Sequence, residues 1–398
     1  MRMPSPGVWV VRFAVPVLLA GAPERALGRG EYGAAVEAGP ELDSNPRRLP
    51  QQGTDSAQSA PLLRVTASGR AQVPLGDRFR LGAQLNGGGK VFFTEAGRPA
   101  DEAVAGGQLE VTSRVRRALA LAAAGSYYDA FQRQSERDFR TGSAFLRLHL
   151  SHPASATSGM LQLGYLGLRY KPVPDYSFHG LVGGVALTRE LSSGREDEVV
   201  NWRLGVSYAA TLRDYDGPLI GVRERCEPAP GALMLCNYPK EGSRYDVGQV
   251  LRAEVSYLGN AAATLWYSAE LNHSNSYGES FVRQVLGLKF TTHLPWGLFF
   301  TVKGALQFSR FRDPYLTSQV ATQTFVSIDD ENRSNLVLHV GRDLWARWSV
   351  GLRYNLYVNE SVSSGSPAAA AATTRLPGFL RHTLFVGLRF EYESADGS

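Results

Sequence analysis

The sequence predicts an all-β protein: a single transmembrane, antiparallel, up-and-down β-barrel of about sixteen strands, within a range of roughly 14–18. Three observations carry this prediction. Apolar residues recur at every second position, the segments that show this pattern are long, and the connections between them alternate in length. The 398 residues are 43% hydrophobic and 20% charged, with a formal net charge of +5.

Composition also excludes other classes. No segment after residue 28 has the roughly 18 consecutive apolar residues that a membrane helix needs. The basic residues form no block of the kind that binds nucleic acid, so we expect no nucleic-acid partner.

Residues 1–28 have the features of a secretory signal peptide. Arg2 and Arg12 precede an apolar run over 13–22, which is too short to cross a bilayer as a helix but fits the apolar core of a signal. Ala26 and Gly28 flank Leu27, so we expect cleavage after Gly28. The alternative is a short N-terminal anchor helix. We expect residues 29–398 to form one barrel domain in the bacterial outer membrane.

The segment 347–359 shows the alternation clearly, because Val350, Leu352 and Tyr354 alternate with Gly351 and Arg353. Successive residues of a strand point to opposite faces, so this strand has one apolar and one polar face. The same pattern predicts strands at 31–39, 61–70, 77–87, 107–115, 117–128, 138–150, 157–170, 176–188, 198–213, 245–258, 261–274, 279–293, 297–310, 332–343, 347–359 and 379–392.

Segment length favours a membrane wall over a soluble sandwich. Strands of soluble proteins average about five or six residues, whereas tilted spanning strands need roughly nine to eleven. Most of the predicted segments reach the longer value. The segment 117–128 is the weakest, because its Ala and Leu residues also suit a helix. Extra passes at 90–94 or 322–327 would raise the strand number to about eighteen.

Connection lengths predict which way the barrel faces. If the chain starts on the periplasmic side, connections after even strands are short and those after odd strands can be long. Short connections occur at 72–76, 116–117, 259–260, 294–296 and 344–346, and long ones at 41–61, 87–106, 214–244, 311–331 and 360–378. The two cysteines, Cys226 and Cys236, fall in a long connection. In an exported chain we expect them to form a disulfide in an outer loop.

The last predicted strand carries a specific motif. In 383–392, Gly387, Phe390 and Tyr392 fit the pattern x-G-x-x-Φ-x-Φ, where Φ is an aromatic or apolar residue. This resembles the assembly signal of outer-membrane β-barrel proteins. The resemblance implies the barrel-assembly machinery as a partner, and outer-membrane lipid and lipopolysaccharide as the surroundings.

Three further runs resemble a subgroup of these barrels. The runs 41–46 (ELDSNP), 332–334 (NRS) and 352–361 (LRYNLYVNES) are similar to barrels found with exopolysaccharide secretion systems. They are less similar to the barrel half of surface-lipoprotein assembly modifiers, which usually carry helical repeats before the barrel. The first resemblance implies polysaccharide export with periplasmic export proteins as partners.

The polar face of the predicted strands would line the lumen, and basic residues predominate on it. Charged rings set the ion preference of a pore, so this lining predicts attraction of anions or weakly acidic polymers. The alternative is that these residues pair across the lumen and only stabilise its wall. Tyr357 and Phe385 could offer sugar-stacking surfaces. The predicted lumen-lining residues are Arg64, Arg80, Arg114, Arg147, Arg203, Arg252, Lys289, Lys303, Arg353, Arg389, Glu254, Glu270 and Tyr357, with Glu37, Glu110 and Glu391 as further acidic members.

The sequence thus predicts a conduit, most specifically for exopolysaccharide export. A general or anion-selective porin for small solutes and a non-conducting barrel with adhesive loops are the alternatives. We do not expect an enzyme. His273, beside Ser274, is the best hydrolase candidate, but adjacent strand residues point to opposite faces and cannot form a dyad by themselves. The spacing of cysteine, histidine and glycine residues predicts neither a metal site nor a nucleotide cofactor.

Overall fold

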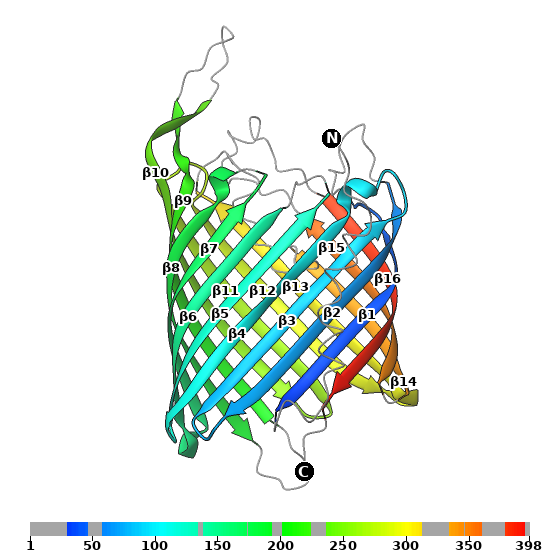
Figure 1. Cartoon of the computed structure of the whole chain (residues 1–398). Coiled ribbons are helices and arrows are strands. Elements are labelled where there is room, and N and C mark those ends of the chain that lie inside the picture. The colour runs from blue at the N-terminus through cyan, green and yellow to red at the C-terminus, as the bar shows by residue number, and fades with distance from the viewer. Residues whose placement is uncertain are drawn as a thin grey trace.

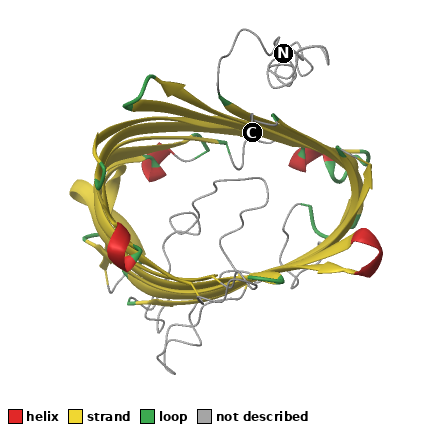
Figure 2. Ribbon diagram, turned by 90° about the horizontal axis from the view of Figure 1, so that it is seen from below, coloured by secondary structure: helices red, strands yellow, loops and turns green. Residues whose placement is uncertain are grey.

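The computed structural model describes residues 30–46, 58–133, 138–172, 174–192, 201–223, 236–312, 334–345, 347–359 and 379–394. These residues form a closed barrel in which each strand pairs antiparallel with its sequence neighbours and the first strand pairs with the last (Figure 1). Viewed from below, the strands form a complete ring (Figure 2). Among the described residues, no helix is both long and apolar enough to cross a membrane.

The barrel has sixteen strands, as the periodicity predicts. They are β1 (Glu31–Asp43), β2 (Ala60–Leu75), β3 (Phe79–Phe92), β4 (Glu102–Arg116), β5 (Leu119–Gln132), β6 (Phe139–His152), β7 (Thr157–Tyr170), β8 (Phe178–Ser192), β9 (Asn201–Arg223), β10 (Cys236–Leu258), β11 (Ala261–Ser274), β12 (Phe281–Leu294), β13 (Leu298–Phe311), β14 (Ser334–Trp345), β15 (Trp348–Asn359) and β16 (Phe379–Glu393).

Each predicted segment overlaps one of these strands, so the fold class is confirmed. The weakest prediction, 117–128, is strand β5. Residues 90–92 extend β3 and are not an extra pass. Three predicted features lie outside the described residues: the expected signal peptide at 1–28, the segment 322–327 and Cys226. Cys236 begins β10 without a described side chain. The expected disulfide therefore stays a prediction.

Short turns gather at one end of the barrel and longer connections at the other. The short-turn end holds residues 76–78, 117–118, 153–156, 259–260 and 295–297. Strands β9 and β10 rise above their neighbours at the opposite, long-loop end (Figure 1). Outer-membrane barrels place short turns in the periplasm and long loops outside. This rule assigns the long-loop end to the cell exterior.

The seam between β1 and β16 closes the sheet, with Gly33 opposite Glu393 at one end and Asp43 opposite Thr383 at the other. The two backbones approach closely at Gly39, where an added Cβ would lie 1.9 Å from the carbonyl oxygen of Val386. Only a residue without a side chain fits there. Closure matters because each unpaired backbone amide in the membrane hydrocarbon would raise the free energy of the folded barrel by roughly several kcal/mol.

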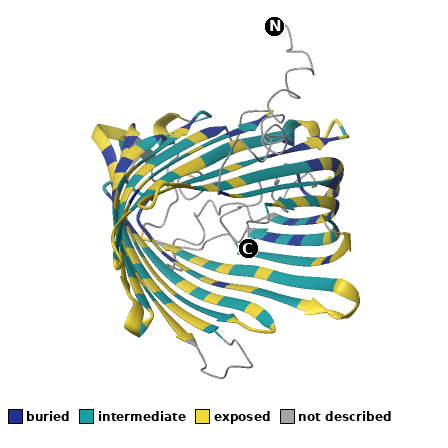
Figure 3. Ribbon diagram, turned by 60° about the horizontal axis from the view of Figure 1, so that its bottom comes forward, coloured by how far each residue is buried: buried dark blue, intermediate teal, exposed yellow. Residues whose placement is uncertain are grey.

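Exposed and less exposed residues alternate along the strands (Figure 3). On one face of the sheet large apolar side chains are exposed, including Leu146 at 68% and Leu163 at 63%. The residues between them include most of the polar and charged side chains, together with buried apolar ones such as Phe385 and Tyr357. A continuous exposed apolar belt around a closed barrel is stable only in contact with lipid. The exposed apolar face is therefore the outer face, and the polar face is the lumen face.

Candidate functional site: the lumen wall

Strand register places every predicted lumen-lining residue on the lumen face. Along the β12–β13 pair, for example, Lys289 lies opposite Lys303, whereas the exposed Leu286 and Leu306 lie opposite each other on the outer face. The same parity continues from strand to strand around the closed ring. The sequence pattern alone therefore identifies the face of each residue, but not its environment.

Most of the predicted basic residues are paired with a carboxylate. In six cases the nitrogen to oxygen distance lies between 2.5 and 3.1 Å. The pairs are Arg64 with Glu41, Arg147 with Glu110, Arg203 with Glu190, Arg252 with Glu254, Arg353 with Glu37 and Arg389 with Glu391. Glu270, another predicted residue, pairs with Arg283 at 3.0 Å. These residues therefore form ion pairs within the barrel wall, which is the arrangement expected if they stabilise the wall.

Four predicted bases are different. Arg80, Arg114, Lys289 and Lys303 are exposed on the lumen face, and no carboxylate of the described residues lies within 4.0 Å of them. Lys289 and Lys303 are direct cross-strand partners. Like charges that face each other across strands are destabilising unless an anion screens them. This pair therefore forms a positive patch on the wall, with Thr264 opposite Lys289 on the other side.

Two acidic residues of the lumen face, Glu31 and Asp343, also have no described ion-pair partner. They lie away from the lysine pair. Val337 of β14 lies opposite Lys303, and Asp343 lies further along the same strand. At the usual strand rise, Asp343 is roughly 20 Å from Val337. The local field at the lysine pair is therefore positive even though the whole lumen is of mixed charge.

On the lumen face, the long-loop half of β16, β1, β2 and β3 is packed and buried. Glu41 accepts from Arg64 at 3.1 Å and lies 3.2 Å from Lys90, and all three side chains are at most 3% exposed. Asp43 pairs with Arg381 at 2.5 Å in the same cluster. We call these five residues the seam cluster. It joins the first strands of the chain to the last one.

The seam cluster corrects one expectation. Phe385 is 1% exposed and lies between the guanidinium groups of Arg64 and Arg353, at 5.5 and 5.2 Å. Tyr357 is 4% exposed beneath Arg381. Both rings are on the lumen face, but they are covered by their neighbours. They are packing residues and do not offer open surfaces for sugars.

An aromatic residue that the sequence reasoning missed is placed better for such contact. Trp266 is half-buried on the lumen face, and its ring lies over Gly287, where an added Cβ would be 2.0 Å from the indole. Arg252 lies 5.4 Å from the ring centre. Gly287 is two residues from Lys289, so an indole surface and the lysine pair are about 7 Å apart along β12. In β11, Trp266 alternates in phase with polar residues such as Thr264 and Ser268. This alternation is the sequence signal that indicates an inward-facing Trp266.

A second group missed from sequence lies at the long-loop end of β10–β12. Arg244 pairs with Asp246 at 2.8 Å and with Glu279 at 3.1 Å, and Asn272 donates to Asp246 at 3.1 Å. Glu279 belongs to the connection 275–280 and not to a strand. Burial raises the pKa of Glu279 to about 7, although Arg244 opposes this shift. No local motif in the sequence announces a contact between Arg244 and a residue so far along the chain.

The closed sheet, its lipid-facing belt and its polar lumen define a bacterial outer-membrane β-barrel. Its size is that of the channel-forming barrels, which enclose more space than side chains alone fill.

No family model and no curated protein matches the sequence. Among solved structures, the chain is similar to OpdQ from Pseudomonas aeruginosa, with 8% identity over 92% of this chain and 99% of that chain and a TM-score of 0.46. It is also similar to OccAB1 from Acinetobacter baumannii, with 10% identity over 92% and 97% and a TM-score of 0.45. A structure titled bacterial polysaccharide outer membrane secretin shares 12% identity over 91% and 97%, with a TM-score of 0.40. Likenesses of this size leave the cargo to be inferred from the chain's own residues.

Proposed function

We propose that this chain is an outer-membrane conduit whose lumen favours anionic cargo. The observation that carries the proposal is the set of exposed lumen bases without a described carboxylate partner, above all the opposed pair Lys289 and Lys303. An anion between two such ammonium groups relieves their repulsion. Fixed charge of one sign on a low-dielectric wall raises the local concentration of the opposite ion by roughly tenfold or more.

The paired bases contribute less to this preference. Arg203 and Arg389 each lie within 3.0 Å of a carboxylate, so each pair presents little net charge to a passing ion. The preference should therefore depend on a few positions, and not on the total number of arginines in the lumen.

The specific cargo we propose is an acidic exopolysaccharide. Its support is the indole of Trp266, which lies beside the lysine pair on the lumen face. A pyranose ring can stack on an indole while its carboxylate meets an ammonium group, and small inorganic anions need only the charge. Delivery of the polymer would fall to periplasmic export proteins. Assembly of the barrel would use the β16 motif with Gly387, Phe390 and Tyr392, through the barrel-assembly machinery.

The test of ion preference is the reversal potential in planar bilayers under a salt gradient. We expect the wild-type channel to be anion-selective and the K289Q/K303Q double variant to lose roughly two- to tenfold in anion over cation permeability. The matched control is R389Q/E391Q, which changes two lumen side chains without changing net charge, and it should leave the ratio unaltered. Equal ratios in wild type and K289Q/K303Q would overturn the proposal.

The test of cargo uses the same channels. We expect an acidic oligosaccharide such as oligogalacturonate to block the current at lower concentration than a neutral oligosaccharide of equal length, and W266A to weaken that block. A channel that conducts small anions but shows no difference between the two sugars would be a small-solute porin. A folded barrel without any conductance would be the display protein of the third alternative.

A further inference from the structure

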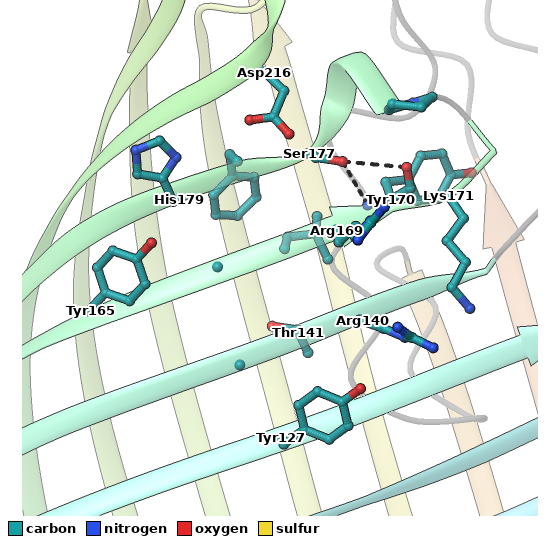
Figure 4. Close-up of a pocket in the computed structure, with 15 residues that line it drawn as sticks. Tyr127, Arg140, Thr141, Tyr165, Arg169, Tyr170, Lys171, Ser177, His179 and Asp216 are labelled. Carbon is teal, nitrogen blue, oxygen red and sulfur yellow. Dashed lines mark hydrogen bonds between the residues drawn. The ribbon is translucent and has the colours of Figure 1, made fainter.

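A groove of about 820 Å³ lies on the outer face of β5–β9, near their long-loop ends (Figure 4). Its floor includes Gly142 of β6 and Gly167 of β7, which are direct cross-strand partners. A Cβ added at either glycine would be 3.7 Å from its nearest neighbour, so the floor is open backbone that a side chain could fill without a clash. Tyr127 and Tyr165 form its walls.

The groove lies where the lipid-facing belt ends. Along β6 and β7, the outward side chains towards the short-turn end are apolar and exposed, as at Leu146 and Leu163. Tyr127 and Tyr165 come next, at the height where aromatic residues mark the membrane interface. Beyond the two tyrosines, the outward residues are Arg140 on β6 and Arg169 on β7. A molecule in the groove would contact the membrane hydrocarbon at one end and the charged arginine side chains at the other. An amphiphile fits both environments.

The charged end of the groove has a defined arrangement. Arg140 of β6 and Arg169 of β7 are direct cross-strand partners on the outer face. Asp129 of β5 pairs with Arg140 at 2.9 Å and lies 3.6 Å from Lys171, which is also 3.8 Å from Asp138. Arg169 is exposed, and within the part of the chain that the structure describes no carboxylate lies within 4.0 Å of it.

Only one of these two opposed arginines, Arg140, has a carboxylate partner, so the pair leaves an unbalanced positive charge. The guanidinium group binds phosphate in a bidentate manner. The carboxylate of Asp216 also lines the groove, on the β9 side. His179 lies on the same side, 3.9 Å from Asp214. The anionic group of a ligand is therefore favoured at the β6–β7 side of the groove and disfavoured at the β9 side.

We propose that this groove binds the phosphorylated sugar headgroup of a glycolipid in the outer leaflet. The phosphate would lie on Arg169 and Arg140, a sugar ring on the Tyr165 side of the glycine floor, and the acyl chains along the apolar belt below. This site is on the lipid side of the wall, so the inference does not depend on the cargo of the lumen.

The test uses the full-length protein purified in detergent and native mass spectrometry with added diphosphoryl lipid A, its dephosphorylated form, or inorganic phosphate. We expect the protein to retain diphosphoryl lipid A. The R140Q/R169Q variant should weaken retention roughly tenfold or more, because it removes the charge-assisted hydrogen bonds of both guanidinium groups to the phosphate. G167L, which fills the floor, should weaken it as well. The matched control is R310Q, an outward arginine next to the long-loop end of β13 and away from the groove, and it should have no effect.

Three results would overturn the inference: equal retention of the dephosphorylated lipid, retention of inorganic phosphate at the same concentration, or an equal loss in R310Q. Resistance of each variant to unfolding in cold detergent, seen as the usual gel shift on heating, checks that the barrel is folded. A folded G167L protein that still retains the lipid as wild type does would exclude the groove itself.

Discussion

Two regions of the same lumen face use the same residue types in opposite ways. In the seam cluster, Arg64, Lys90 and Arg381 are buried and share Glu41 and Asp43. On β12 and β13, Lys289 and Lys303 are exposed and face each other. The first arrangement holds the ends of the chain together, because a buried cation needs its counter-charge. The second leaves its charge available to a solute. Basic residues in a barrel lumen therefore say nothing about selectivity until their partners are known.

The largest effect should come from the closest backbone contact of the seam. Gly39→Val would place side-chain atoms where the carbonyl of Val386 lies, so β1 and β16 could pair only after a backbone shift. We expect most of the G39V chain to remain unassembled when it is refolded into detergent, measured by the gel shift on heating.

Gly69 of β2 provides the control, since an added Cβ there would be 4.0 Å from its nearest neighbour. G69V should assemble as the wild type does. Equal assembly of G39V and wild type would show that the seam tolerates a side chain and that the close approach is not required for closure.

The next effect separates buried from exposed ion pairs. Glu41→Ala removes the carboxylate that Arg64 and Lys90 share, and loss of one partner of a buried pair costs about 3–5 kcal/mol of unfolding free energy. Glu391→Ala removes the partner of the exposed Arg389, which should cost about 1 kcal/mol or less. Urea unfolding in lipid vesicles measures both. Similar costs for the two variants would remove the distinction between the seam cluster and the open wall.

A smaller effect concerns pH at the long-loop rim. The pKa of Glu279 is raised to about 7 from its ordinary 4.5, so between these values the folded protein binds a proton that the unfolded chain releases. This contribution is fully present below pH 4.5 and is lost as the pH rises through 7. We expect the barrel to lose on the order of 1–3 kcal/mol of stability between pH 4.5 and pH 8 through this group.

Glu279→Gln should flatten that part of the pH dependence while leaving stability at low pH nearly unchanged. The measurement is the unfolding midpoint in urea at several pH values. A wild-type curve that rises between pH 5 and pH 8, in parallel with E279Q, would contradict this assignment.

Much of the fold could be predicted because alternation is local. The faces of Arg203, Lys289 and Arg353 follow from their immediate neighbours, and each register shift by one residue would turn the apolar side inward. Strand ends were less predictable. The hairpin of β9 and β10 extends past the predicted limits 213 and 245, where Lys240 pairs with Leu219 by backbone contacts without an apolar alternation.

The ion pairs could not be predicted, because alternation reports only on neighbouring residues of one strand and these pairs join distant parts of the chain. Arg353 and Glu37 meet across the seam although 316 positions separate them, and only closure of the ring brings them together. Likewise, Phe385 lies against Arg64 of β2 and Arg353 of β15, and Tyr357 lies against Arg381 of β16. The opposed arginines of the outer groove depend on the register of β6 against β7, which no short motif specifies.

The central claim is that unpaired lumen bases set the ion preference of the barrel. The most direct measurement is the reversal potential of the K289E/K303E channel in a planar bilayer, compared with that of the wild type. The account predicts that the sign changes from anion-selective to cation-selective, because the positive patch becomes negative without a change in the rest of the wall. A K289E/K303E channel that stays as anion-selective as the wild type would contradict it.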